Sequence, residues 1–346
     1  MKQFVVLPKL QKGDRVSIIS PSADLAGRFP WVTELGLKRL HDVFGLKPVE
    51  YPTTRKLGAS LEARAQDIMA AFEDKDTKAV IATLGGDDQI KLLKHLNPEV
   101  IQANPKPFFG YSDNTHLQLY LWNLGIPSYY GGCLMTQFGM EQAMHDYTVE
   151  YLNHAFFDTG DYELKRSDVY NDISNEWANK DELEKERVLE PNNQWFWDGH
   201  GDIEGTLWGG CLESMVVESA AGIYFPKDKD LDGTILFIES ADGNTDEWIA
   251  DYILSGFGER GWLDKFQAVL VGRAKAWELN LHRTVEEKTE YRKKQREQIV
   301  KTIRQYNKTI PIIQNLDFGH TDPQAVLPNG GRVRVRSGEQ RIFLQY

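Results

Sequence analysis

Short apolar runs alternate with helix-like segments over the first 150 residues of this chain. The clearest run, residues 78–84 (KAVIATL), carries no charge after its first residue and stops at Gly85 and Gly86. Apolar runs of this kind between helical segments are typical of parallel strands buried on both faces. Because consecutive parallel strands need a crossover helix, the alternation predicts an α/β fold with a doubly wound parallel sheet. The other expected elements are strands at 15–20 and 107–111 and helices at 31–43, 61–72 (capped by Ser60), 88–96 and 114–124.

The alternation stops at residues 159–200, a polar segment that carries Trp177, Trp195 and Trp197. A long polar segment with large aromatic side chains is more typical of a folded functional loop than of a linker. The apolar runs resume after it and predict a second α/β unit. We therefore expect an N-terminal α/β domain at 1–158, a Trp-bearing loop and junction at 159–200, and a C-terminal domain at 201–346. The expected elements of the last part are strands at 203–208, 233–239, 268–271 and 310–313, a helix at 285–306 and a hairpin at 332–344.

The net charge limits which classes of binding partner are expected. The 51 acidic and 40 basic residues give a formal net charge of −11. An acidic chain repels phosphate backbones and anionic lipid head groups, so neither nucleic acid nor a membrane is expected as a partner. No apolar stretch is long enough to span a bilayer, and a cytoplasmic location is expected. The two cysteines, Cys133 and Cys211, exclude a disulfide framework, and no metal-binding motif is present. We expect no metal and no cofactor.

The sharpest local signal is residues 108–114 (FFGYSDN), in which an apolar strand leads directly into a helix. Ser112 stands at that junction, as the serine of a nucleophile elbow does. The backbone N–H of Asp113 would then point toward a developing oxyanion. The match to G-x-S-x-G is partial, because Asn114 stands at the position of the last glycine. The alternative is that Ser112 or Asp113 caps the helix.

A nucleophilic serine needs a base and a group that orients the base. His116 lies one helical turn after Ser112 and is one candidate base. His320 lies in a loop after a predicted strand and is the other candidate. Glu239 ends the apolar strand at 233–239, where open α/β sheets place their sites, or else it turns into solvent. The chain order of serine, acid and histidine is also that of α/β hydrolases.

Two glycine motifs have competing interpretations. Gly85 and Gly86 lie between a strand and a helix, which fits a phosphate cradle, a backbone donor to an oxyanion, or a plain turn. The aspartates at 87 and 88 and the lack of a Walker lysine argue against phosphate. Residues 256–261 (GFGERG) fit G-x-G-x-x-G but follow a helical segment, so a dinucleotide site is rejected.

Several separated motifs, in order, resemble the LD-carboxypeptidase family of serine peptidases. The similarity spans nearly the whole chain. The motifs are 13–16 (GDRV), 85–86 (GG), 110–113 (GYSD), 209–210 (GG), 236–239 (LFIE), 318–321 (FGHT) and 327–330 (LPNG).

The resemblance implies a Ser-His-Glu triad of Ser112, His320 and Glu239, with an oxyanion hole from the backbone of Gly86 and Asp113. It also implies a doubly wound N-terminal domain that supplies the serine and a smaller C-terminal α/β domain that supplies the glutamate and histidine. The site would then form where the two domains meet. Members of the family are commonly dimers, so a homodimer is expected.

The family has two branches with different substrates. Murein LD-carboxypeptidases remove a terminal D-alanine from muropeptides, and microcin C immunity peptidases cleave the amide of an aminoacyl-nucleotide. The Trp-bearing loop makes this chain more similar to the second branch, in which Trp177 would stack on the nucleobase and Gly85 would contact substrate. Cys211 stands after the Gly209–Gly210 turn where relatives usually have asparagine. A two-domain protein that binds a small ligand without chemistry is the alternative from another class.

Overall fold

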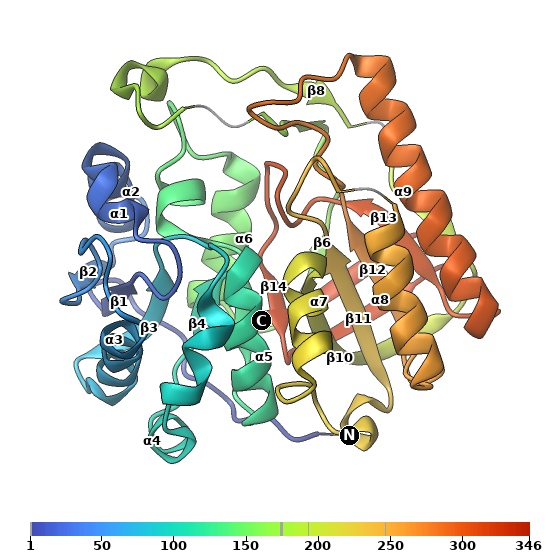
Figure 1. Cartoon of the computed structure of the whole chain (residues 1–346), viewed down its shortest axis with the longest axis horizontal. Coiled ribbons are helices and arrows are strands. Elements are labelled where there is room, and N and C mark those ends of the chain that lie inside the picture. The colour runs from blue at the N-terminus through green and yellow to red at the C-terminus, as the bar shows by residue number, and fades with distance from the viewer. Residues whose placement is uncertain (1, 174–175, 193, 246) are drawn as a thin grey trace.

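The first sheet of the fold carries the predicted parallel topology. The computed structural model describes residues 2–173, 176–192, 194–245 and 247–346. The first sheet has six strands in the order β14-β5-β4-β3-β1-β2, and every pair except β14–β5 is parallel (Figure 1). The doubly wound prediction is confirmed. The strands are β1 (Arg15–Ile19), β2 (Lys47–Glu50), β3 (Thr77–Ala82), β4 (Phe108–Gly110), β5 (Ser128–Tyr130) and β14 (Leu327–Asn329).

The helices of this half connect consecutive strands, as the sequence predicts. Ser60 caps α3, because its hydroxyl accepts a hydrogen bond from the Ala63 N–H at 3.2 Å. The expected helix at 88–96 is wrong: two short 3₁₀ turns, Gln89–Lys91 and Leu93–His95, occupy this segment. Asn97, which precedes Pro98, has an extended backbone and caps the next helix, so a helix in this segment has to end before it. The helices are α1 (Leu25–Arg28), α2 (Pro30–Asp42), α3 (Leu61–Glu73), α4 (Pro98–Ala103), α5 (Thr115–Asn123) and α6 (Asp146–Phe157).

A second sheet of eight strands has the order β6-β16-β15-β10-β11-β12-β13-β9. Its centre, from β10 to β13, is parallel. Helices α7 (Leu212–Ala221) and α8 (Trp248–Glu259) lie in front of these strands in Figure 1, and α9 (Val285–Tyr306) packs on α8. The predicted hairpin is confirmed as β15–β16. The strands are β6 (Asp161–Leu164), β9 (Phe196–Asp198), β10 (Asp202–Cys211), β11 (Thr234–Glu239), β12 (Ala268–Gly272), β13 (Ile312–Leu316), β15 (Arg332–Arg336) and β16 (Arg341–Gln345).

The Trp-bearing loop is tied into the second sheet at both ends. Strand β6 forms one edge of that sheet and β9 forms the other. Between them, β7 (Val169–Tyr170) and β8 (Glu190–Pro191) pair with each other. Gly209 and Gly210, expected as a turn, lie inside β10 instead, because they pair in register with Phe237 and Ile238 of β11. Within the described ranges, no helix is long and apolar enough to cross a membrane.

Candidate active site

Ser112 lies in a strained turn between β4 and α5. Its φ is +65°, a left-handed conformation that costs a residue with a side chain about 1–3 kcal/mol. No side-chain cap hydrogen bond is formed at the start of this turn or of α5. An N-cap residue would have an extended backbone and such a bond. The geometry is therefore that of a nucleophile elbow and not that of a helix cap.

A partly buried His320, in the loop after β13, pairs with a buried Glu239 at the end of β11. Nδ1 of His320 lies 2.7 Å from Oε2 of Glu239, and Glu239 is 1% exposed at the end of β11, so it does not turn into solvent. Gly319 makes the approach possible: its φ is +95°, and a Cβ there would lie 2.6 Å from the Glu239 carboxylate. The Tyr111 ring packs edge-on against the imidazole, with centroids 4.8 Å apart. The His320 ring is thus held in one orientation.

Tyr130 was not identified from the sequence, yet it links the glutamate to the serine. Its hydroxyl donates to Oε1 of Glu239 and accepts a hydrogen bond from the backbone N–H of Ser112 at 3.4 Å. Burial, and then the Glu239 charge, raise the pKa of Tyr130 well above its usual value, so the phenol remains a donor. A polar residue at the end of a strand is the signal that would have revealed it, but β5 has only three residues.

Ser112 and His320 line the same cavity, which has a volume of about 710 Å³. The predicted substrate residues Gly85 and Trp177 also line it, and Trp177 packs edge-on against Phe29 with centroids 5.8 Å apart. A cavity of this size accommodates a drug-sized ligand. Its outer wall, which we define as the lining residues of the Trp-bearing loop and of the segment after β12, consists of Ile173, Glu176, Trp177, Ala178, Arg187, Lys275 and Leu279.

The glycine turn after β3 comes close to the serine. A Cβ on Gly85 would lie 2.8 Å from the Ser112 hydroxyl and 3.4 Å from the Asp113 backbone nitrogen. Gly86 lines the same cavity. Of the three interpretations of this motif, this close approach to Ser112 favours a backbone donor beside the serine.

His116, the other candidate base, lies buried between two carboxylates. Its Nδ1 is 2.8 Å from Glu218 and its Nε2 is 3.4 Å from Asp113. Burial alone would lower its pKa, but hydrogen bonds to Asp113 and Glu218 outweigh burial and raise the pKa of His116 to about 9. A protonated imidazole has no lone pair to accept a proton. Carboxylates also occupy both ring nitrogens, so the structure favours His320 over His116 as the base.

Cys211, Glu239 and His320 form the one group among the described residues that could supply three metal ligands, with ligand atoms within 4.8 Å of one another. These residues fit a metal poorly. Glu239 and His320 already share a 2.7 Å hydrogen bond. Burial, and then the charges of Glu213 and Glu239, raise the pKa of the Cys211 thiol well above its usual value, whereas a metal ligand must be a thiolate.

The strained serine lies at a strand–helix turn and lines the same cavity as a histidine that is bound to a carboxylate. These features together are typical of serine hydrolases. Family models narrow the class: the LD-carboxypeptidase N-terminal domain matches residues 16–131 and the LD-carboxypeptidase C-terminal domain matches residues 204–335. The chain belongs to the LD-carboxypeptidase family, as the resemblance implied, and is a serine-type carboxypeptidase.

Individual relatives match over most of the chain. YocD of Bacillus subtilis (strain 168), named as a carboxypeptidase, is 31% identical over 97% of this chain and 98% of its own length. The microcin C7 self-immunity protein MccF of Escherichia coli is 27% identical over 82% of this chain and 78% of its own length. A crystal structure of an MccF-like protein from Streptococcus pneumoniae in complex with AMP has a TM-score of 0.83 and 26% identity, covering 96% of this chain and 99% of that one.

Proposed function

We propose that this peptidase hydrolyses the amide bond of an aminoacyl-nucleotide of the microcin C type, with Ser112, His320 and Glu239 as its triad. The observation that carries the proposal is the strained Ser112, which lines one cavity with a histidine bound to a buried glutamate. Strain of this kind persists where it positions a reacting group.

The proposed chemistry is acyl transfer in two halves. Nε2 of His320 takes the hydroxyl proton as Oγ of Ser112 attacks the amide carbonyl, and Glu239 stabilises the imidazolium. The N–H groups of Gly86 and Asp113 receive the oxyanion, each contributing about 3 kcal/mol. His320 then protonates the leaving nitrogen as the C–N bond breaks. Water, deprotonated by His320, hydrolyses the acyl-enzyme and releases the acid.

The nucleotide specificity rests on the cavity. Its volume of about 710 Å³ and the indole of Trp177 in its outer wall suit a nucleobase, because an aromatic ring stacks on any base. The pneumococcal MccF-like protein was crystallised with AMP, and MccF is a self-immunity protein against microcin C7. These likenesses favour the same substrate class here.

A second candidate substrate is a murein tetrapeptide that loses its terminal amino acid. Arg187 and Lys275 both line the cavity. Either cation would fit the carboxylate of a peptide C-terminus, which an aminoacyl-nucleotide lacks.

The test is to incubate the protein with an aminoacyl sulfamoyl adenosine and, separately, with a muropeptide tetrapeptide. We expect faster cleavage of the nucleotide analogue and a loss of at least about a thousandfold in kcat in Ser112→Ala. Faster cleavage of the tetrapeptide would assign the murein reaction instead. Tight binding without cleavage of either compound would indicate a binding protein.

A further inference from the structure

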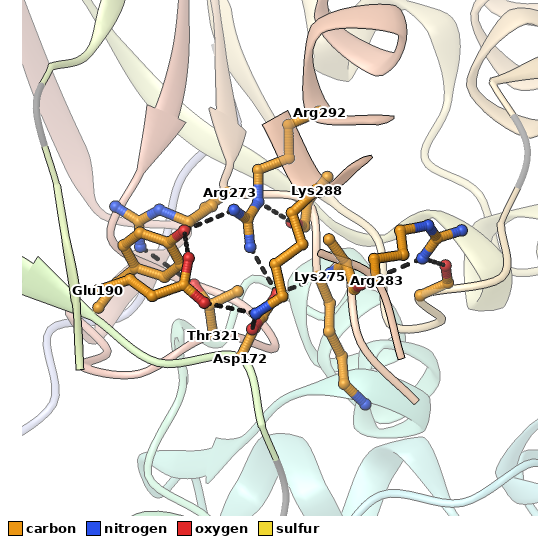
Figure 2. Close-up of polar contacts among 12 residues, drawn as sticks. Asp172, Glu190, Arg273, Lys275, Arg283, Lys288, Arg292 and Thr321 are labelled. Carbon is orange, nitrogen blue, oxygen red and sulfur yellow. Dashed lines mark hydrogen bonds and ion pairs between the residues drawn. The ribbon is translucent and has the colours of Figure 1, made fainter. Parts of the chain in front are cut away.

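A buried ionic cluster, which contains none of the proposed triad residues, joins the Trp-bearing loop to helix α9, and Figure 2 labels four of its members. We call it the loop anchor, and it consists of Tyr170, Asp172, Glu190, Lys288 and Arg292. Nζ of Lys288 lies 2.7 Å from Asp172 and also pairs with Glu190, and Arg292 pairs with Asp172. Arg292 donates a second hydrogen bond to the Tyr170 hydroxyl at 2.6 Å, and that hydroxyl donates to Glu190. The anchor therefore ties β7 and β8 of the Trp-bearing loop to helix α9.

Asp172 holds both segments that form the outer wall. It directly precedes Ile173, the first wall residue of the Trp-bearing loop. Its Oδ2 also accepts a hydrogen bond at 3.0 Å from the backbone N–H of Ala276, which follows the wall residue Lys275. In Figure 2 the side chain of Lys275 points away from the anchor. One carboxylate thus fixes the starting points of two wall segments about 100 residues apart.

Because the ions of the loop anchor are buried, the desolvation cost limits how much they can stabilise the fold. The side chains of Asp172, Lys288 and Arg292 are 0%, 6% and 9% exposed. Desolvation of buried ions offsets most of their attraction, so apolar residues of similar volume would stabilise the fold equally well. Ion pairs, unlike apolar contacts, specify one geometry through directional hydrogen bonds. The anchor is therefore better explained by the placement of the wall than by stability.

We infer that Asp172 is a positioning residue for the outer wall, which fixes the subsite that receives the leaving-group side of the substrate. The inference deepens the proposed function and rests on it. Asp172 does not line the cavity, so it acts through the two segments that it holds. Loss of the anchor should weaken the binding of substrates that reach the wall and spare those that reach only Ser112 and His320.

The first experiment measures how readily the Trp-bearing loop, which supplies part of the outer wall, opens to a protease, and it needs no substrate. Lys180 and Lys185 are exposed in the Trp-bearing loop, and trypsin cleaves such sites when the segment opens locally. We expect Asp172→Asn to be cut at these lysines about tenfold faster than the unaltered protein. The matched control is Asp198→Asn, which breaks the ion pair of Asp198 with Arg304 on the same helix but contacts neither wall segment. Its cleavage rate should not change.

The second experiment measures specificity. We expect Asp172→Asn to raise KM for an aminoacyl sulfamoyl adenosine about tenfold at unchanged kcat, and to leave kcat/KM for a simple aminoacyl amide within about twofold. If Asp172→Asn fails to fold, the same two measurements are made on Lys288→Met, because Arg292 still neutralises Asp172 in that variant. Unchanged proteolysis, or an equal loss on both substrates, would overturn the inference. Failure of the unaltered protein to cleave either compound would count against the proposed function alone, since the proteolysis result still stands.

Discussion

His116 is a buried residue whose imidazole lies between two carboxylates. It contacts Asp113 on its own helical turn and Glu218 on α7, so it connects the serine-bearing segment to the second sheet's helices. Asp113 also accepts hydrogen bonds from Ser22 and from the Gln89 N–H, which fixes the residue whose backbone we propose as an oxyanion donor. His116, which the sequence analysis considered as a candidate base, therefore has a structural role.

The charge of His116 gives a prediction for stability. Folding raises its pKa from the usual 6.5 to about 9, so its stabilisation is complete below pH 6.5 and is lost as pH rises from 6.5 to 9. The loss should amount to about 3 kcal/mol in the free energy of unfolding. Urea denaturation across this range should show the decline in the unaltered protein and a flatter profile in His116→Gln. The exposed His200, replaced by Gln, is the control, and an equal decline in both variants would disprove the assignment.

At the scale of elements, local pattern predicted much of the first half and parts of the second. The run at 78–84 became β3, and residues 108–114 became the strand and turn that hold Ser112, because both signals lie within a few neighbouring residues. The pairing of β14 with β5 and the placement of β6 and β9 at the edges of the second sheet depend on contacts between distant segments. Short strands such as β5 carry too few residues for periodicity, so Tyr130 was missed. His320 and Glu239, 81 residues apart, were paired through the family resemblance.

The loop that carries His320 gives the prediction at this scale. In Gly319→Ala, the new Cβ would collide with the Glu239 carboxylate and would require a positive φ. We expect kcat/KM to fall by at least about a hundredfold, because displacement of the imidazole by about 1 Å is costly in an active site. Gly338→Ala is the control, since Gly338 has no positive φ and no neighbouring atom within 4 Å of a Cβ. Similar activity in the two variants would show that the loop position does not matter.

At the scale of the whole molecule, the two sheets share one apolar core. One apolar core includes Val80 and Phe108 of the first sheet together with Ile235 and Leu344 of the second. Polar contacts also cross between the halves: the backbone N–H of Cys211 donates to the Thr115 hydroxyl at 3.0 Å. The site depends on this union, because Ser112 comes from the first half and Glu239 and His320 come from the second.

Calorimetry tests whether the two halves unfold together. Since one core spans both sheets, the protein should unfold in a single thermal transition whose calorimetric and van't Hoff enthalpies agree. Two resolved transitions would show that the halves fold independently. In that case the geometry of the site would depend on docking of the halves rather than on one core.

The central claim, that His320 and Glu239 activate Ser112, is tested most directly by mass spectrometry after reaction with a diphenyl phosphonate. The Ser112 oxygen would form a bond to phosphorus, one phenol would leave, and His320 would take the hydroxyl proton. We predict one adduct per chain, located on Ser112 and absent from His320→Gln. No adduct on Ser112, or equal labelling of Ser112 in the variant, would contradict the claim.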